Sequence, residues 1–113
     1  MADIIEKIEA AVQENKIMIF MKGNRSFPLC GFSAATVAIF DEIGEPYATA
    51  DVLSDPELRD AIKQYSNWPT IPQVYVDGKF VGGCDIIREM FQAGELKSLF
   101  KEKGVPLKEG AQV

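Results

Sequence analysis

The tetrapeptide Cys30-Gly31-Phe32-Ser33 has the residue types and the spacing with which proteins carry out thiol chemistry. The apolar run over 17–21 before it predicts a buried strand. A helix is predicted to start at Cys30 and to stop at Gly44, from residues that recur at helical spacing: Phe32, Thr36, Ile39, Phe40 and Ile43. The unpaired N–H groups and the positive dipole end of a helix N-terminus stabilise a sulfur anion. We therefore expect a lowered pKa for the Cys30 thiol, which makes it a thiolate at neutral pH.

Position 33 decides what that thiolate can do. In a Cys-x-x-Cys pair the second thiol resolves a mixed disulfide from within, but Ser33 cannot close a disulfide. Two uses of Cys30 follow, namely slow exchange with a thiol from outside the chain and binding of a soft metal. The alternative is a small side chain packed under a helix cap, because free cysteines are usually buried and inert.

Composition narrows the possible functions. The chain has 113 residues, enough for one domain. A net charge of −5 argues against a nucleic-acid partner, and no apolar run approaches the roughly 18–20 residues of a membrane span. The start of the chain lacks the marks of a leader, so we expect a cytoplasmic protein or one already processed. With two cysteines and no histidine, Cys-His catalysis and zinc sites that need imidazole are excluded.

Other local patterns predict the elements that position Cys30. The first half of the chain predicts an opening helix ending near 14–15, a strand over 47–51 and a helix from the capping box Ser54-Asp55-Pro56-Glu57. The second half predicts a strand over 73–76, the two-residue turn Asp77-Gly78 and a returning strand over 79–81. Helices are predicted from Asp85 and continue past Gly94. A βαβ unit followed by an antiparallel ββα unit predicts an α/β domain, with a four-stranded mixed sheet and helices on both faces. This order fits a thioredoxin-like fold.

Four motifs in this order resemble the monothiol glutaredoxins of the Cys-Gly-Phe-Ser type. They are Met21-Lys22-Gly23, Cys30-Gly31-Phe32-Ser33, Trp68-Pro69-Thr70-Ile71-Pro72-Gln73 and Val81-Gly82-Gly83-Cys84-Asp85. The resemblance covers about residues 3–103 and is close to the short bacterial members. It implies that 1–113 is a single glutaredoxin domain, with 104–113 as a flexible tail.

The resemblance also implies a function. Such proteins use glutathione and hold a [2Fe–2S] cluster between two copies of the chain, pass clusters to apo iron–sulfur acceptor proteins, and pair with BolA-like proteins. A [2Fe–2S] cluster is ordinarily held by four thiolates. Cys30 from each of two chains and two glutathione thiols would supply four.

Glutathione has two carboxylates and one ammonium, and the motifs contain groups that suit each. Lys22 and Arg59, at positions that the family uses, suit one carboxylate; Lys63 lies one helical turn from Arg59 and could help, although a solvated position is the favoured interpretation. The N–H groups of Cys84 and Asp85 suit the other carboxylate. The Asp85 side chain suits the ammonium or is a plain N-cap, and both can hold together.

The resemblance further implies a cis peptide bond before Pro72 and backbone pairing of Ile71 with the cysteinyl part of glutathione. Thr70 is expected to line the same groove, and Trp68 to pack beside it. Cys84 could ligate metal or pair with Cys30, but the favoured interpretation is a small buried side chain whose N–H binds.

Two departures from the family pattern are visible. The loop over 24–29 differs, so that Arg25 is expected to change the charge near the thiolate and Phe27 to change the dimer contact. Ile71 stands where many members have phenylalanine.

The competing function is a monothiol oxidoreductase that removes glutathione from protein mixed disulfides, for which weak activity is expected. A third interpretation is an iron-sensing adaptor.

Overall fold

A computed structural model describes residues 2–43 and 46–103 of the chain. Its elements in order are α1 (Ala2–Glu14), β1 (Ile17–Met21), α2 (Gly31–Ile43), β2 (Ala48–Asp51), α3 (Pro56–Ser66), β3 (Gln73–Val76), β4 (Lys79–Gly82), α4 (Cys84–Gln92) and α5 (Glu95–Lys103). The predicted helix stop at Gly44 and the tail over 104–113 lie outside the described residues.

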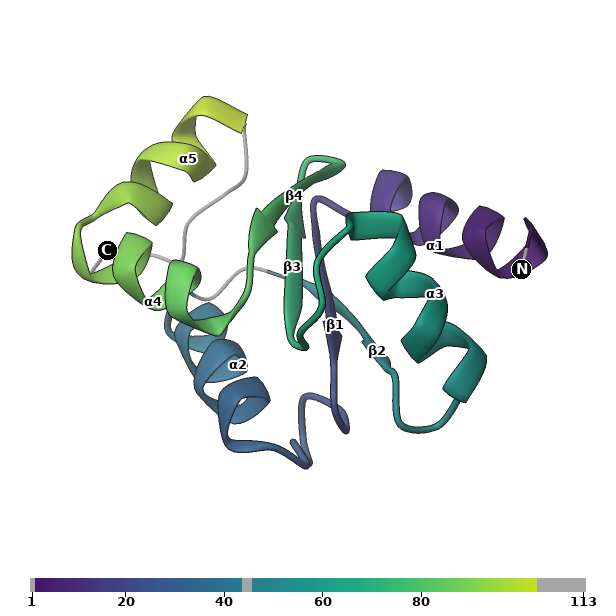
Figure 1. The fold of residues 1–113 in the computed structure, drawn as a ribbon. Helices are drawn as coiled ribbons and strands as arrows, with labels where there is room; N and C mark the ends of the chain where they lie inside the picture. Colours follow the sequence, from purple (N-terminus) through teal and green to yellow (C-terminus); the bar gives the residue numbers. More distant parts are fainter. Residues whose placement is uncertain (1, 44–45, 104–113) are drawn as a thin grey trace.

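The four strands form one mixed sheet in the order β2-β1-β3-β4. β1 runs parallel to β2 and antiparallel to β3, and β3 runs antiparallel to β4. Figure 1 shows α1 and α3 on one face of this sheet and α2, α4 and α5 on the other. The predicted thioredoxin-like fold, with a four-stranded mixed sheet between helical layers, is therefore confirmed.

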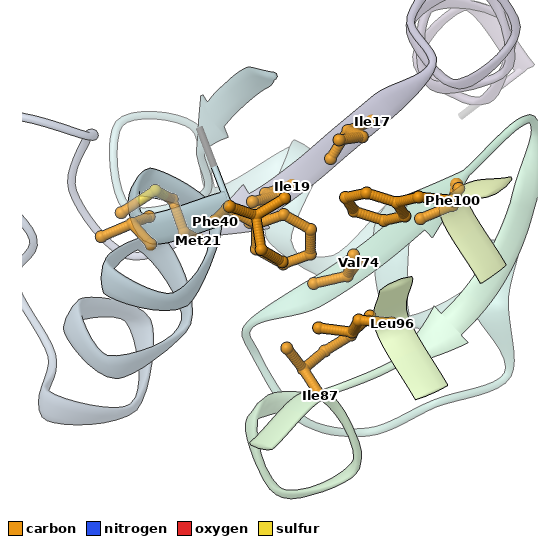
Figure 2. Close-up of a cluster of buried hydrophobic side chains, with 11 residues drawn as sticks. Ile17, Ile19, Met21, Phe40, Val74, Ile87, Leu96 and Phe100 are labelled. Atoms are coloured by element: carbon orange, nitrogen blue, oxygen red, sulfur yellow. The ribbon is translucent and has the colours of Figure 1, made fainter. Parts of the chain in front are cut away.

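The side chains of β1 are buried by helices on both faces of the sheet. All five of its residues are buried, as a strand in the middle of a sheet covered on both faces should be. Its side chains alternate between two cores, and three of them enter the one beneath α2, α4 and α5: Ile17, Ile19 and Met21. Phe40 and Phe100 stack there with ring centroids 6.2 Å apart, and Figure 2 shows this cluster. Met18 and Phe20 pack on the other face, against α1 and α3.

The start of α3 corrects one detail of the sequence analysis. A capping box of the spacing 54–57 would make Ser54 the cap, but the cap is Asp55, whose carboxylate accepts the N–H groups of Glu57 and Leu58. Pro56 explains the shift. A proline excludes the helical conformation from the residue before it, so the extended Asp55 (φ −147°) must stand outside the helix.

We expect Asp55→Ala to lower the free energy of unfolding by about 1 kcal/mol, because two N–H groups of the first turn lose their acceptor. Ser54→Ala should change it by about 0.5 kcal/mol or less, since Ser54 is exposed and its hydroxyl only donates to the Asp51 carbonyl. Urea unfolding of both variants measures the difference. A larger loss from Ser54→Ala would contradict the assignment of the cap.

The C-terminal half differs little from expectation. The turn residues Asp77 and Gly78 both have positive φ (52° and 81°), as the tight hairpin between β3 and β4 requires. The last helical region begins at Cys84 rather than Asp85, and Gly94 (φ 76°) separates α4 from α5. Within residues 2–43 and 46–103, no helix is long and apolar enough to cross a membrane.

Candidate functional site

Cys30 occupies the N-cap position of α2. Its carbonyl accepts the N–H of Ala34 at 2.9 Å, the first hydrogen bond of the helix. Its half-buried sulfur accepts the N–H groups of Ser33 and Phe32, so the thiolate acts as the capping anion. The N–H of Ser33 lowers the pKa of the Cys30 thiol most, and the N–H of Phe32 and the charge of Lys22 lower it further. Partial burial of the thiol opposes them. The predicted direction of the pKa shift is confirmed.

Ser33 has a positive role that the sequence analysis did not identify. Its side chain is fully buried, and its hydroxyl oxygen accepts the backbone N–H of Lys22 at 3.1 Å. That bond ties the end of β1 to the first turn of α2. The same hydroxyl donates to the Cys30 sulfur and thereby contributes to the lowered pKa. Ser33 therefore both replaces a resolving thiol and stabilises the thiolate that remains.

The lowered pKa predicts how Cys30 reacts with pH. Alkylation by iodoacetamide needs the thiolate, so its rate should reach half of its plateau at a lower pH in folded protein than in protein unfolded in guanidinium chloride. Folding favours the deprotonated form, so stability is gained as pH rises through the folded-state pKa and lost as it falls. Lys22→Gln and Ser33→Ala should each move the midpoint upward, because each removes a group that stabilises the anion. An unchanged midpoint in both variants would contradict this account.

A groove of about 460 Å³ lies between α3, the segment before β3 and the start of α4. Cys30 itself does not line it, but Lys22, whose charge acts on the Cys30 thiol, and Phe32 do. Lys22, Arg59 and Lys63 all line it, although they come from the end of β1 and from α3. Lys63 therefore lines the groove; a solvated position was the favoured interpretation from the sequence. Among these cations, the exposed Arg59 lies 4.0 Å from the Asp60 carboxylate. Three cations in its lining make the groove suitable for a carboxylate.

The N-terminus of α4 also lines the groove. Gly83 is the N-cap, with no side-chain cap bond, and its carbonyl accepts the N–H of Ile87. The N–H groups of Cys84 and Asp85 belong to the first turn and have no partner within the helix, as an anion site requires. A Cβ at Gly83 would lie 3.1 Å from the Pro72 carbonyl oxygen. Glycine therefore lets α4 approach the segment before β3.

Asp85 is not an N-cap, which corrects one of its two expected roles. It lies in the first turn of α4, because the extended Gly83 already provides the cap. Its side chain is 83% exposed at the rim of the groove, with Arg88 at 3.9 Å. A carboxylate so placed remains available to an ammonium, although Arg88 competes for it.

The segment Trp68–Pro72 forms one wall of the groove. The Ile71–Pro72 peptide bond is cis, as the family resemblance implied, and Thr70 and Ile71 both line the groove. Trp68 packs on Phe80 with ring centroids 5.6 Å apart, which confirms its packing role. Its indole Nε1 is the one buried side-chain nitrogen or oxygen without a hydrogen-bond partner in the described part of the chain.

Cys84 is buried, and its sulfur accepts a hydrogen bond from the Arg88 guanidinium at 3.4 Å. Both cysteines are free thiols. Within the described ranges, no group of three or more His, Cys, Asp or Glu side chains could hold a metal ion. One chain therefore offers a metal the single accessible thiolate of Cys30.

Large apolar side chains surround Cys30 on the surface, and the sequence analysis mostly missed them. Phe27 is 73% exposed, Leu29 60% and Phe32 59%, and Leu53 lies at the groove rim. Phe32 shares the helical spacing of buried residues of α2, yet its side chain is exposed and lines the groove, whereas Ser33 in the same turn is fully buried. The exposure of Phe27 could not be inferred from its sequence neighbours, since it depends on how the loop folds back.

Arg25 does not act on the thiolate, contrary to expectation. Its guanidinium lies 2.8 Å from the Asp41 carboxylate and 4.4 Å from the centre of the Tyr47 ring, and Tyr47 donates to the same carboxylate. Burial and this bond to Asp41 raise the pKa of Tyr47. Arg25 therefore fastens the tip of the loop over 24–29 to α2 and to the start of β2. The loop that carries Phe27 is therefore held by the contacts of Arg25 with Asp41 and Tyr47, which do not line the groove.

Comparison with known proteins agrees with this geometry. The sequence profile of the glutaredoxin family matches residues 17–81. A monothiol glutaredoxin of Synechocystis is 54% identical over 95 residues, covering 84% of this chain and 89% of the relative. Glutaredoxin 4 of Escherichia coli K12 is 47% identical over 108 residues, 96% and 94% of the two chains. Among solved structures, a buckwheat glutaredoxin–glutathione complex superposes with a TM-score of 0.80 at 26% identity, covering 92% of this chain and 93% of that one.

Proposed function

The chain belongs to the glutaredoxin family, in its monothiol branch, and from this premise we propose that it binds glutathione and carries a [2Fe–2S] cluster between two copies of itself. The observation that carries the proposal is the pairing of one accessible thiolate, Cys30, with a groove whose lining suits anions. The cluster is cargo, passed on to apo iron–sulfur proteins.

The charges of the groove match those of glutathione. One carboxylate of the tripeptide would lie among Lys22, Arg59 and Lys63, and the other at the first N–H groups of α4. The Asp85 carboxylate would take the ammonium, and the backbone of Ile71 would pair with the cysteinyl residue. The glutathione complex of the buckwheat relative supports the ligand class.

Donor count supports the assembly. Four thiolates are needed, and each chain offers Cys30 while each bound glutathione offers one more, so two chains and two tripeptides complete the set. The exposed Phe27, Leu29 and Phe32 would be covered when a second chain approaches. A BolA-like protein would use the same surface in place of the second copy. A reducing compartment such as the cytoplasm would keep Cys30 ready for this role.

Anaerobic reconstitution tests the proposal. Protein treated with ferrous iron, sulfide and glutathione should become red-brown and show the mass of a dimer. Protein treated identically without glutathione should stay colourless and monomeric, because half of the thiolates are then missing. A coloured monomer, or colour that does not depend on glutathione, would overturn it.

The second candidate is a monothiol oxidoreductase, favoured by the accessibility of the Cys30 sulfur. In that reaction the thiolate attacks the glutathione sulfur of a protein mixed disulfide and releases the protein thiol; a second glutathione then attacks the Cys30 mixed disulfide and releases oxidised glutathione. We expect slow turnover in a coupled assay with glutathione reductase. Turnover equal to that of a dithiol glutaredoxin would reverse the order of the two candidates.

A further inference from the structure

Gln73, the first residue of β3, is a fully buried polar side chain beside the core that α1 and α3 cover. A buried amide is costly unless its hydrogen bonds are made. Its NH₂ group donates to the carbonyl oxygens of Trp68 at 3.1 Å and Thr70 at 3.3 Å, and its oxygen accepts the Tyr75 hydroxyl at 3.2 Å. All of these partners but Tyr75 belong to the wall of the groove.

The bond to Thr70 has a geometric consequence for its neighbour. The Thr70 carbonyl and the Ile71 N–H belong to one planar peptide group, and this group is trans because the cis bond is the next one, Ile71–Pro72. In a trans peptide the C=O and N–H bonds point in opposite directions. Gln73 holds the Thr70 carbonyl, so the Ile71 N–H points to the side of the peptide group opposite Gln73; Ile71 also lines the groove.

The backbone of the segment Trp68–Pro72 is not held by hydrogen bonds from the segment's own side chains. The Trp68 indole N–H has no hydrogen-bond partner, and Thr70 is exposed. The Trp68 backbone N–H is fixed from α3, by the Lys63 carbonyl and the Ser66 hydroxyl. The Gln73 amide instead donates hydrogen bonds to the carbonyl oxygens of Trp68 and Thr70.

We propose that Gln73 is a positioning residue that directs the Ile71 N–H into the groove, so that an extended peptide ligand can pair with it. The inference rests on the proposed function, in which that ligand is glutathione. Gln73 touches no ligand atom; it acts through the Thr70–Ile71 peptide group. Loss of its two donors should leave the fold and the thiolate in place and weaken the ligand.

Gln73→Met tests this, because methionine fills a similar unbranched volume without donors. The affinity for reduced glutathione, from titration calorimetry, should fall about tenfold, since one backbone bond loses its alignment. The shift of the Ile71 amide signal on adding glutathione should shrink, whereas the pH midpoint of Cys30 alkylation should stay that of wild type. Tyr75→Phe is the matched control: it removes one bond to Gln73 but leaves both amide donors, and its affinity should stay within about twofold of wild type.

Four outcomes are distinguishable. Weaker binding by Gln73→Met with an unchanged Cys30 midpoint supports the inference. Equal binding by Gln73→Met and wild type, or equal weakening by Tyr75→Phe, overturns it and leaves the proposed function standing. No binding by wild type overturns the proposed function and the inference together. If Gln73→Met does not fold, hydrogen exchange of the wild-type protein tests the inference instead. The Gln73 NH₂ protons should exchange slowly with solvent, and fast exchange would overturn the inference.

Discussion

Cys30→Ser should abolish the colour and the dimer of the reconstituted protein. A serine hydroxyl stays protonated at the N-terminus of α2 and is a poor ligand for iron, so each chain would lose the one accessible thiolate that it offers. The visible spectrum and the mass in solution after reconstitution measure the loss. The change should not disturb the fold, because serine is smaller than cysteine and is a good N-cap residue.

Cys84→Ser is the matched control, since it removes the other thiol of the chain. Cys84 is buried with Arg88 on its sulfur, so it should not reach a cluster that Cys30 holds, and the variant should keep the colour. Its backbone N–H, which is assigned to the ligand, remains. Colour retained by Cys30→Ser, or lost in a well-folded Cys84→Ser, would show that the ligand assignment is wrong.

Gly23→Ala should lower the free energy of unfolding by about 3 kcal/mol, the largest stability loss expected near the site. Gly23 has a φ of +85°, which L side chains rarely adopt, and an added Cβ would lie 2.3 Å from the Phe27 carbonyl oxygen. It would also lie 2.7 Å from the Leu29 nitrogen, which bonds the Lys22 carbonyl. All of these neighbours are backbone, so the loop that leads to Cys30 must open.

Gly31→Ala is the control: it shows whether the loss of stability comes from the positive φ and close contacts of Gly23 or from replacing any glycine by alanine. A Cβ at Gly31 would meet nothing within 4 Å, and Gly31 is the first residue of α2. Its free energy of unfolding should stay level or rise by up to about 1 kcal/mol, because alanine reduces the entropy of the unfolded chain. Urea unfolding of the two variants compares them. Equal losses would contradict the steric explanation.

The thiolate was predictable because it depends on short-range structure. A strand, a loop and an amphipathic helix placed Cys30 at a helix N-terminus, and N–H groups two and three residues away lower its pKa. The turn Asp77-Gly78 was predictable for the same reason, since two residues with positive φ favour these types. The cap at Asp55 was missed by one residue, although Pro56 carried the signal that would have located it.

The rest of the site depends on contacts between distant segments. Lys63 was placed on a solvated face because a helical pattern shows which residues share a face, but not what lies opposite. Phe32 has the helical spacing of the buried residues of α2, yet its own side chain is exposed while Ser33 in the same turn is buried. The role of Gln73 has no local signal, since its partners are carbonyls of the wall that returns to it.

The family, the order of the elements and the chemistry of the Cys30 thiol could be read from local patterns, because periodicity, caps and turns act over a few residues. Two features appear only in the folded chain: Lys22, two cations of α3 and the N-terminus of α4 line one groove, and apolar side chains near Cys30 in the sequence stay exposed. The physical reason is that charge and exposure at a point in space depend on every segment that packs there, whereas the pattern of one segment records its own conformation.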